Sequence, residues 1–362
     1  MQFSVSKSAL TQALALVGRV VGKNSTIPIL SNVKLEAAGE SLTITGTDLE
    51  LALSVRVEAK VTEPGVATLP AKKLSDYSRL LPEGDVCFKV SDKAWATITA
   101  GRSKTRISGM SPESFPELPA APETVLSVPV APLLKLINRV KMAISNIESR
   151  FTLNGAKFEY REGRLYLIAT DGHRLAFASA EMAGNAEVKF LLPLSAIKNL
   201  PQVAGAVEAL AISQDDNHLF FRAGEALLVS RKMTGNFPDF ERVLPKAAKS
   251  VVTCNRLELA GALSRVSQFA DERSRAVKIA LQAGELVVSA TAVEAGESTE
   301  AVPCDFDGEG IEMGFNAQYL SEFLGAIESD QVELRLTDAK SAGELRTAGG
   351  ADYRYVVMPM RI

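Results

Sequence analysis

Apolar side chains recur with helical spacing at three places along the chain. Leu10, Leu14 and Val17 follow the i, i+4, i+7 pattern that predicts one apolar helix face. The pattern returns 123 residues later and again after 126 more, and the side chains that repeat it are Leu133, Ile137, Val140, Leu259, Leu263 and Val266. A short extended stretch precedes each copy. The sequence therefore predicts three equivalent units, each opened by a strand and a helix.

Other elements keep the same offsets. Residues 42–48 reappear as 165–171 and again, more loosely, as 286–292. A second helix per unit is indicated by the matched apolar positions Leu74, Ile197 and Leu320. Between the helices, alternating apolar and polar residues such as those of 51–57 predict strands. The helices are expected at 6–23, 71–82, 131–146, 194–203, 255–270 and 317–328.

These patterns predict an α+β fold of three repeated domains. Each domain would pack two helices on antiparallel sheets of about eight strands. The domains are expected at 1–120, 121–245 and 246–362, with linkers at the proline-rich segment 111–123 and at 236–249. The alternative is an α+β protein whose periodicity is coincidental.

Charge is sorted along the chain and between elements. The predicted domains carry net charges of +2, +1 and −6, so opposite ends are complementary and suit a head-to-tail contact. The predicted helices hold twelve basic and four acidic side chains, a net of +8, which leaves −11 elsewhere. A basic helical face fits the phosphate backbone of DNA, although solvated helix faces are the plainer interpretation. The sequence has no motif for sequence-specific reading of nucleic acid.

Composition excludes several classes of protein. Hydrophobic residues make up 46% and charged residues 23%, which suits packed cores. Three scattered cysteines, Cys87, Cys254 and Cys304, form no CxxC motif, so we expect neither a disulfide framework nor a cysteine zinc site. Only two histidines occur, which argues against a multi-histidine metal centre. We expect a cytoplasmic protein with no cofactor and no metal.

Two segments could carry specific chemistry. Asp171 and His173 stand two apart and could form an acid–base pair, but no nucleophile motif, P-loop or dinucleotide motif accompanies them. An Asp-Gly turn is the simpler interpretation, and Gly172, His173 and Arg174 occur only in the middle unit, which favours a binding site used once per chain. The methionine-rich end, 355–362, suits the wall of an adaptable apolar pocket.

Helix packing limits the assembly if the helices line a ring. Helices about 8–10 Å apart would place six on a circle about 17 Å across, too narrow for DNA. Twelve would leave a passage of roughly 23 Å, enough for a duplex about 20 Å wide. A dimer of three-domain chains therefore fits around DNA.

The chain resembles, over its full length, the β sliding clamps of bacterial DNA polymerase III, a family of processivity factors. The segments that carry the resemblance are 47–50, 153–155, 170–175, 237–240, 242–245, 314–316 and 356–361. The resemblance implies a head-to-tail homodimeric ring of six similar domains around double-stranded DNA, held without sequence specificity. It also implies a pocket for short peptide motifs of the DNA polymerase III α subunit, the clamp loader, other polymerases and repair proteins.

The resemblance also implies which residues serve each role. The peptide-binding pocket would comprise Leu153, Thr170, Gly172, His173, Arg174, Leu175, Pro238, Arg242, Val243, Asn316, Tyr319, Val356, Met358, Pro359, Met360 and Arg361. The DNA-facing residues would be Lys7, Arg79, Arg139, Lys141 and Lys198. The dimer interface would join Lys73, Arg102, Lys104, Arg106 and Ile107 to Gln268, Phe269, Glu297 and Glu300.

In two places the sequence departs from the family pattern. Asn24 stands where a basic residue can occur, and Phe151 and Thr152 stand where a tyrosine pair can occur. Both departures bear on loops that would contact DNA.

Two other functions compete with a non-enzymatic clamp. One is an adaptor that binds peptides but not DNA, which a helix face of mixed charge would favour. The other is a hydrolase that uses Asp171 and His173, which a nucleophile motif would favour. The sequence contains neither feature.

Overall fold

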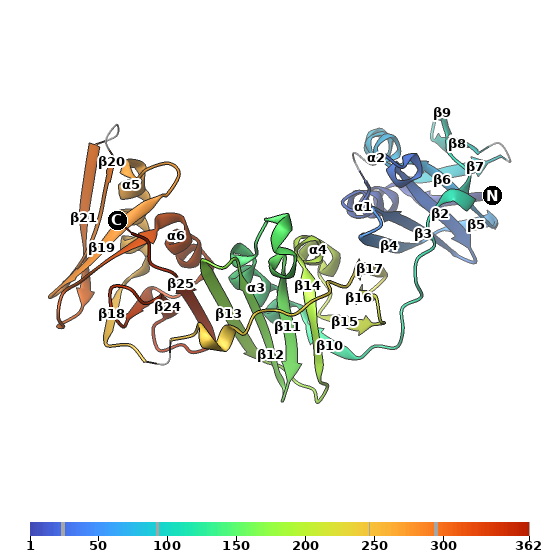
Figure 1. The fold of residues 1–362 in the computed structure, drawn as a ribbon. Helices are drawn as coiled ribbons and strands as arrows, with labels where there is room; N and C mark the ends of the chain where they lie inside the picture. Colours follow the sequence, from blue (N-terminus) through green and yellow to red (C-terminus); the bar gives the residue numbers. More distant parts are fainter. Residues whose placement is uncertain (23–25, 92–93, 246, 293–295, 362) are drawn as a thin grey trace. The chain divides into compact units, whose positions relative to one another are not determined.

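The computed structural model describes residues 1–22, 26–91, 94–245, 247–292 and 296–361. The chain forms two compact units, one of residues 1–131 and 195–232 and the other of 132–194 and 233–362 (Figure 1). Helices and antiparallel sheets occur in both units, which confirms the α+β class.

The first unit contains two antiparallel sheets. The five-stranded sheet has the order β5-β1-β7-β8-β9, with β1 (Gln2–Ser6), β5 (Lys60–Glu63), β7 (Asp85–Val90), β8 (Trp95–Ala100) and β9 (Ser103–Ser108). The eight-stranded sheet has the order β10-β15-β16-β17-β4-β3-β2-β6, with β2 (Asn32–Ala38), β3 (Ser41–Thr47), β4 (Leu51–Glu58), β6 (Gly65–Pro70), β10 (Leu126–Pro129), β15 (Ala209–Gln214), β16 (His218–Ala223) and β17 (Ala226–Arg231).

The second unit is built on one twelve-stranded sheet. Its order is β14-β11-β12-β13-β25-β24-β23-β18-β21-β20-β19-β22. The strands are β11 (Gly155–Arg161), β12 (Arg164–Thr170), β13 (Arg174–Glu181), β14 (Val188–Pro193), β18 (Ser250–Asn255), β19 (Ala276–Gln282), β20 (Glu285–Ala292), β21 (Gly296–Asp305), β22 (Ile311–Asn316), β23 (Gln331–Leu336), β24 (Gly343–Thr347) and β25 (Tyr353–Val357).

Six α-helices lie within the described ranges, two in each predicted repeat. They are α1 (Lys7–Val17), α2 (Ala71–Leu80), α3 (Val130–Val140), α4 (Leu194–Ala204), α5 (Arg256–Val266) and α6 (Ala317–Ala326). The apolar positions that predicted the first helix of each repeat, such as Leu10, Leu133 and Leu259, are all buried. Side chains cap three N-termini: the Ser6 hydroxyl accepts from Ala9 N, and Asn255 and Asn316 cap α5 and α6.

Several helices are shorter than the sequence predicted. The first ends at Val17 rather than near residue 23, because Arg19 N and Val20 N donate to the carbonyls three residues before them, Leu16 and Val17, instead of continuing the i→i−4 pattern. The fifth ends at Val266, and a short 3₁₀ turn, Ser267–Phe269, continues it. Helices commonly end in a frayed or 3₁₀ turn, so the apolar spacing in a sequence can continue past the last residue of the regular helix.

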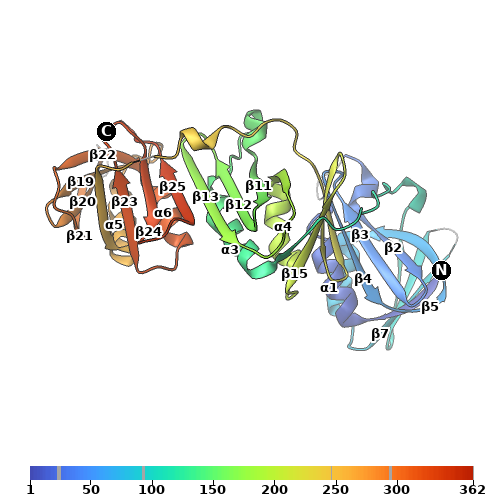
Figure 2. The same ribbon diagram turned by 90° about the horizontal axis from the view of Figure 1, so that it is seen from below.

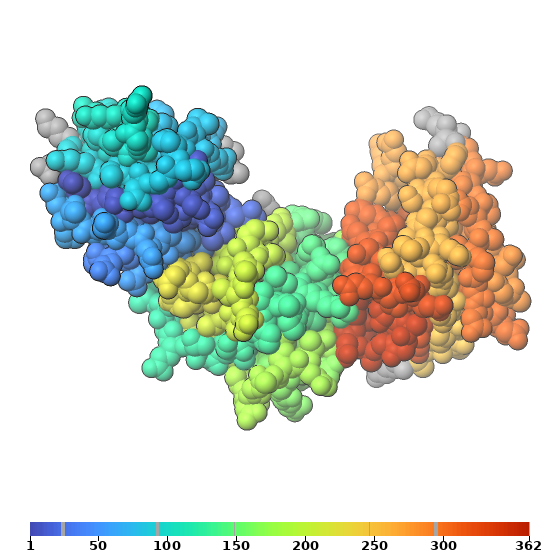
Figure 3. Space-filling model, turned by 180° about the vertical axis from the view of Figure 1, so that it is seen from behind, coloured from blue at the N-terminus to red at the C-terminus, as the bar shows by residue number. Residues whose placement is uncertain are grey.

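Each large sheet joins strands that the sequence assigned to different domains. In the first unit β17 pairs with β4, with Val229 opposite Ala52. In the second unit β25 pairs with β13, with Val356 opposite Leu175, and Figure 2 shows these two strands side by side. Seen from behind in Figure 3, the surface of the last strands adjoins that of the middle repeat. The domain limits at 120 and 245 stay a prediction, since neither compact unit ends there.

Candidate functional site

The segment between β12 and β13 is a tightly bonded turn. The Asp171 carboxylate accepts from the backbone N–H groups of His173 (2.9 Å) and Arg174 (3.0 Å) through Oδ1. The Thr170 hydroxyl donates to the Arg174 carbonyl (2.6 Å) and accepts from Gly172 N (3.1 Å). Gly172 has φ +89°, a conformation that suits glycine. The turn holds His173 exposed at its tip.

The first repeat builds the same turn with different residues. The Asp48 carboxylate accepts from Glu50 N and Leu51 N, and the Thr47 hydroxyl bonds to Leu51 O and Leu49 N. Leu49 occupies the positive-φ position that Gly172 fills in the middle repeat. The Thr-Asp pair is therefore a turn signature, and this removes the main support for an acid–base pair of Asp171 with His173.

Arg174, predicted as a residue of the peptide-binding pocket, is buried. Its guanidinium donates to Asp171 Oδ2 (3.0 Å), to the Tyr355 hydroxyl (3.1 Å), to Glu322 and to the Met142 carbonyl. It also stacks on the ring of Tyr319, with Cζ 4.1 Å from the centroid. These bonds use most of the five N–H donors of the guanidinium and hold the turn in place.

The electrostatics of this cluster favour a permanently charged Arg174. Burial alone would lower the pKa of Arg174, but Tyr355 and Glu322 outweigh burial and the net shift of its pKa is upward. Burial raises the pKa of Tyr355 and, with the nearby Asp171 carboxylate, that of Tyr319. The phenols stay neutral and can bond to the cation, which is the arrangement that a buried charge requires.

The apolar floor beside this cluster is also more covered than predicted. Leu175 and Val356, predicted as pocket residues, are buried in a cluster with Ile168 and Phe240. The cover comes from the segment 236–249, which the sequence treated as a linker. Its partly buried side chains Phe237 and Leu244 pack on the same cluster.

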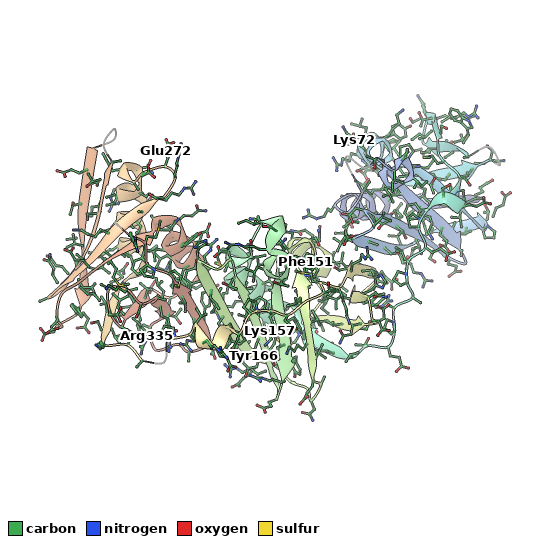
Figure 4. The ribbon with its side chains drawn as sticks, in the orientation of Figure 1. Lys72, Phe151, Lys157, Tyr166, Glu272 and Arg335 are labelled. Atoms are coloured by element: carbon green, nitrogen blue, oxygen red, sulfur yellow. The ribbon has the colours of Figure 1, made fainter. Side chains whose placement is uncertain are left out.

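Two basic groups hold this covering segment on the sheet. The Lys157 ammonium lies 4.9 Å from the centroid of the Phe240 ring, and Figure 4 shows Lys157 and Tyr166 on neighbouring strands of this sheet. Arg354 donates to the Pro245 carbonyl (2.9 Å) and pairs with the buried Glu344. Phe237 and Phe240 were not predicted as site residues, although two aromatic side chains three positions apart, beside Pro238, are the signal that the sequence contains.

The remaining predicted pocket residues differ in how exposed they are. The exposed ones are Gly172, His173, Pro238, Arg242, Val243, Met358 and Arg361, and the half-buried ones are Leu153, Asn316, Tyr319, Pro359 and Met360, while Thr170 is buried. Met358 N donates to His173 O (2.9 Å) and Met360 N to Gly314 O (2.8 Å), so the segment after β25 is fixed to the β12–β13 turn and to β22. All of these residues belong to the second unit. Apolar Val243 (43% exposed) and Met358 (45%) offer the accessible contacts.

The predicted DNA-facing residues differ in their exposure to solvent and in their contacts. Arg79, Lys141 and Lys198 are exposed. Lys7 is half-buried and paired with Glu83 at 2.8 Å. Arg139 is half-buried with its Cζ 5.1 Å from the Tyr353 ring centroid, so it is a packed side chain as well as a cation.

A groove on the helical side of the first unit brings two further basic residues, Arg19 and Lys72, beside the predicted Arg79. It has a volume of about 780 Å³ between α1 and α2, and Arg19, Lys72 and Arg79 line it; Figure 4 marks Lys72. The departure at Asn24 lies outside the described residues. Phe151 is exposed and Thr152 is half-buried.

The predicted interface residues lie on β9, on β21 and on the helices and turns of the same two regions. β9 is the edge of the five-stranded sheet, with Lys104 and Arg106 exposed. Ile107 corrects the prediction: it is buried, because alternate side chains of β9 point into the core. The other residues are the exposed Lys73, Arg102, Gln268 and Glu297, the half-buried Phe269, and the half-buried Glu300, which pairs with Arg265.

Two further features bear on the class of site. Among the residues with described positions, no group of three or more His, Cys, Asp and Glu side chains could hold a metal ion. No helix in the described ranges combines the length and apolar character needed to cross a membrane.

Comparisons with known proteins cover the whole chain. Residues 1–119, 127–239 and 241–361 match the N-terminal, central and C-terminal domains of the DNA polymerase III beta subunit. The Beta sliding clamp of Pseudomonas putida is 35% identical, and that of Haemophilus influenzae 33%, each over 100% of both chains. A crystal structure of the DNA polymerase III subunit beta from Pseudomonas aeruginosa superimposes with a TM-score of 0.95 at 34% identity, again over both full chains. The chain therefore belongs to the DNA polymerase III beta subunit family.

Proposed function

We propose that the chain is a sliding clamp, a non-enzymatic ring that encircles duplex DNA in the cytoplasm and gives the replicative polymerase its processivity. The observation that carries the proposal is a matched pair of open strand edges, β9 and the first part of β21. The ring would form when two chains pair head to tail through these edges.

The open edges follow from the repeat. In each repeat, one strand comes directly after the repeated threonine (Thr47, Thr170 or Thr291), and these strands are β4, β13 and β21. The last strand of each repeat is β9, β17 or β25. The last strand of the second repeat pairs with β4 and that of the third pairs with β13. Among the residues that the structure describes, β9 then pairs only with β8. The residues of β21 before Cys304 pair only with β20, and Cys304 and Asp305 meet β18. One more junction of the same kind would join β9 of one chain to β21 of another.

The register of this junction follows from the two internal ones. Ala52, Leu175 and Glu297 each stand opposite the repeated threonine, at Thr47, Thr170 and Thr291. Ala52 pairs across its junction with Val229, and the 123-residue offset between repeats places Arg106 where Val229 stands. Glu297 would therefore face Arg106 of the second chain. Opposite charges directly across strands stabilise the pairing and fix its register.

DNA would be held by the basic helical face. The observed helices carry nine basic and three acidic side chains, and the most accessible cations include Arg79, Lys141 and Lys198. Exposed lysines and arginines bind phosphates without reading sequence, which suits a ring that must slide.

Partners would dock at the exposed rim of the second unit. Val243 and Met358 supply apolar contacts, and His173, Arg242 and Arg361 supply polar ones. Methionine adapts its shape to different ligands, which fits recognition of short motifs from the DNA polymerase III α subunit, the clamp loader, other polymerases and repair proteins. The Leu175 and Val356 floor would take part only where Phe240 and its neighbours move aside.

Retention on circular and linear DNA tests the proposal. The protein is loaded onto nicked circular DNA by its clamp loader, separated from free protein, and challenged by a single restriction cut. A topological ring stays on the intact circle in high salt and leaves the cut molecule within minutes. Equal retention on both would contradict encirclement, and an adaptor that binds only peptides would be retained on neither.

A further inference from the structure

Two cysteines that stand 50 positions apart in the sequence are direct neighbours in the fold. Cys254 in β18 and Cys304 in β21 face each other in an antiparallel pair (both strands are labelled in Figure 1), and both are free thiols. Their pairing could not be predicted, because the two residues share no local motif.

The hydrogen bonds show which kind of pair this is. Cys304 N donates to the Gly284 carbonyl at 3.0 Å, on the side of β21 that faces away from β18. The N–H and C=O of one strand residue point the same way, so Cys304 forms a non-hydrogen-bonded pair with Cys254. In such pairs the Cα atoms are about 4.5 Å apart and the side chains lie on one face. A disulfide spans Cα separations of about 4.4–6.8 Å.

The two thiols differ in access. Cys254 is 3% exposed, whereas Cys304 is partly exposed. Burial raises the pKa of Cys254 to about 12, and the nearby Cys304 adds to that rise. Burial also raises the pKa of Cys304. A reagent in solution therefore meets Cys304 first, and the reaction is faster in alkaline solution because the thiolate is the nucleophile.

We propose that Cys254 and Cys304 form an intramolecular cross-strand disulfide when the protein meets a small-molecule disulfide. The Cys304 thiolate attacks one sulfur of the oxidant, releases one small thiol and leaves a mixed disulfide. Cys254 then loses its proton and attacks the Cys304 sulfur, which releases the second small thiol. The chain loses two electrons and two protons, and the oxidant gains them as two thiols.

The link would lie where β21 leaves β18. Only two residue pairs, one of them this cysteine pair, join these strands. A covalent bond here would tie β21 to the strand that leads into α5 and would stabilise this part of the second unit by restricting the unfolded chain. The proposal stands whether or not the protein is a clamp.

The test uses the full chain with Cys87→Ser, which removes the exposed third thiol. The protein is incubated with oxidised glutathione at mildly alkaline pH, then freed of reagent and unfolded. We expect both thiols to be lost, a mass lower by two hydrogen atoms, no bound glutathione, and a thermal midpoint raised by several degrees. Migration should stay that of a single chain on a non-reducing gel.

Single variants separate the two steps. Cys254→Ser should stop at one glutathione bound to Cys304, and Cys304→Ser should keep its buried thiol unreacted. A stable mixed disulfide in the parent would overturn the proposal, as would two titratable thiols after full exposure to the reagent. Disulfide-linked dimers of the Cys87→Ser chain would overturn it as well.

Discussion

The guanidinium of Arg174 on β13 lies over the ring of Tyr319 on α6, with Cζ 4.1 Å from the ring centroid. This contact joins the middle repeat to the second helix of the third. The neighbouring His173 points to solvent from the same turn. The Gly172-His173-Arg174 motif therefore divides into an exposed residue that a partner can touch and a buried one that fixes the turn.

Removing the Arg174 side chain should destabilise the second unit. Arg174→Ala leaves Glu322 and Asp171 without their cation, and breaking a buried ion pair costs about 3–5 kcal/mol. Arg174→Lys keeps the charge but not the planar fork, so we expect it to recover only part of the loss. Urea unfolding monitored by tyrosine fluorescence measures both; an alanine variant as stable as the parent would contradict the buried network.

Reversing one charge at an open edge should separate the dimer. Arg106→Glu would face Glu297 across the proposed junction and repel it, so sedimentation should show monomers at concentrations where the parent is a dimer. The double variant Arg106→Glu with Glu297→Arg restores opposite charges at both junctions and should restore the dimer. A double variant that stays monomeric while it remains folded would argue against this register.

Val243 allows a matched test of the exposed rim of the second unit, where partners would dock. Val243→Asp should weaken binding of a peptide with two apolar anchors at least tenfold, measured by fluorescence anisotropy, since it places a charge on an apolar contact. Val251→Asp is the control, because Val251 belongs to the same unit and is similarly exposed (40% against 43%). Equal losses from both variants would place the peptide elsewhere.

Charge reversal on the helical face should weaken DNA binding and its salt dependence. For Arg79→Glu with Lys198→Glu, the slope of log affinity against log salt should fall by roughly one for each lost phosphate contact. Lys340→Glu changes an exposed loop lysine outside the helices and should leave the slope unchanged. Filter binding on duplex DNA across a salt series supplies the comparison, and parallel slopes for all three proteins would contradict the assignment.

The buried phenols should make stability fall in alkaline solution. Burial raises the folded-state pKa of Tyr355, and that of Tyr353 likewise. The stability that each contributes is fully present below the unfolded pKa of about 10 and is lost as pH rises towards the higher folded pKa. Tyr355→Phe removes one such group, so its stability should decline less steeply than the parent's between about pH 9 and pH 11. Identical declines would show that Tyr355 does not titrate differently in the two states.

Local patterns allowed much of the fold to be predicted. Leu10, Leu133 and Leu259 identified the first helix of each repeat because helical periodicity is a local property. The inward direction of the Ile107 side chain was not predicted, because it depends on the position of Ile107 within β9, where alternate side chains point into the core. The burial of Arg174 was missed for a related reason: Glu322 and Tyr355, its partners, come from another repeat.

The pairing of β17 with β4 determines how pieces of this protein can be exchanged or expressed alone. A fragment ending at residue 120 would lack β17, so the backbone edge of β4 would be bare beside the apolar Leu51 and Leu53. Unpaired strand edges of this kind promote aggregation, because their free N–H and C=O groups can pair with another chain. Chimeras between relatives should therefore swap β4 and β17 together, as one cassette, although more than 160 residues of sequence separate them.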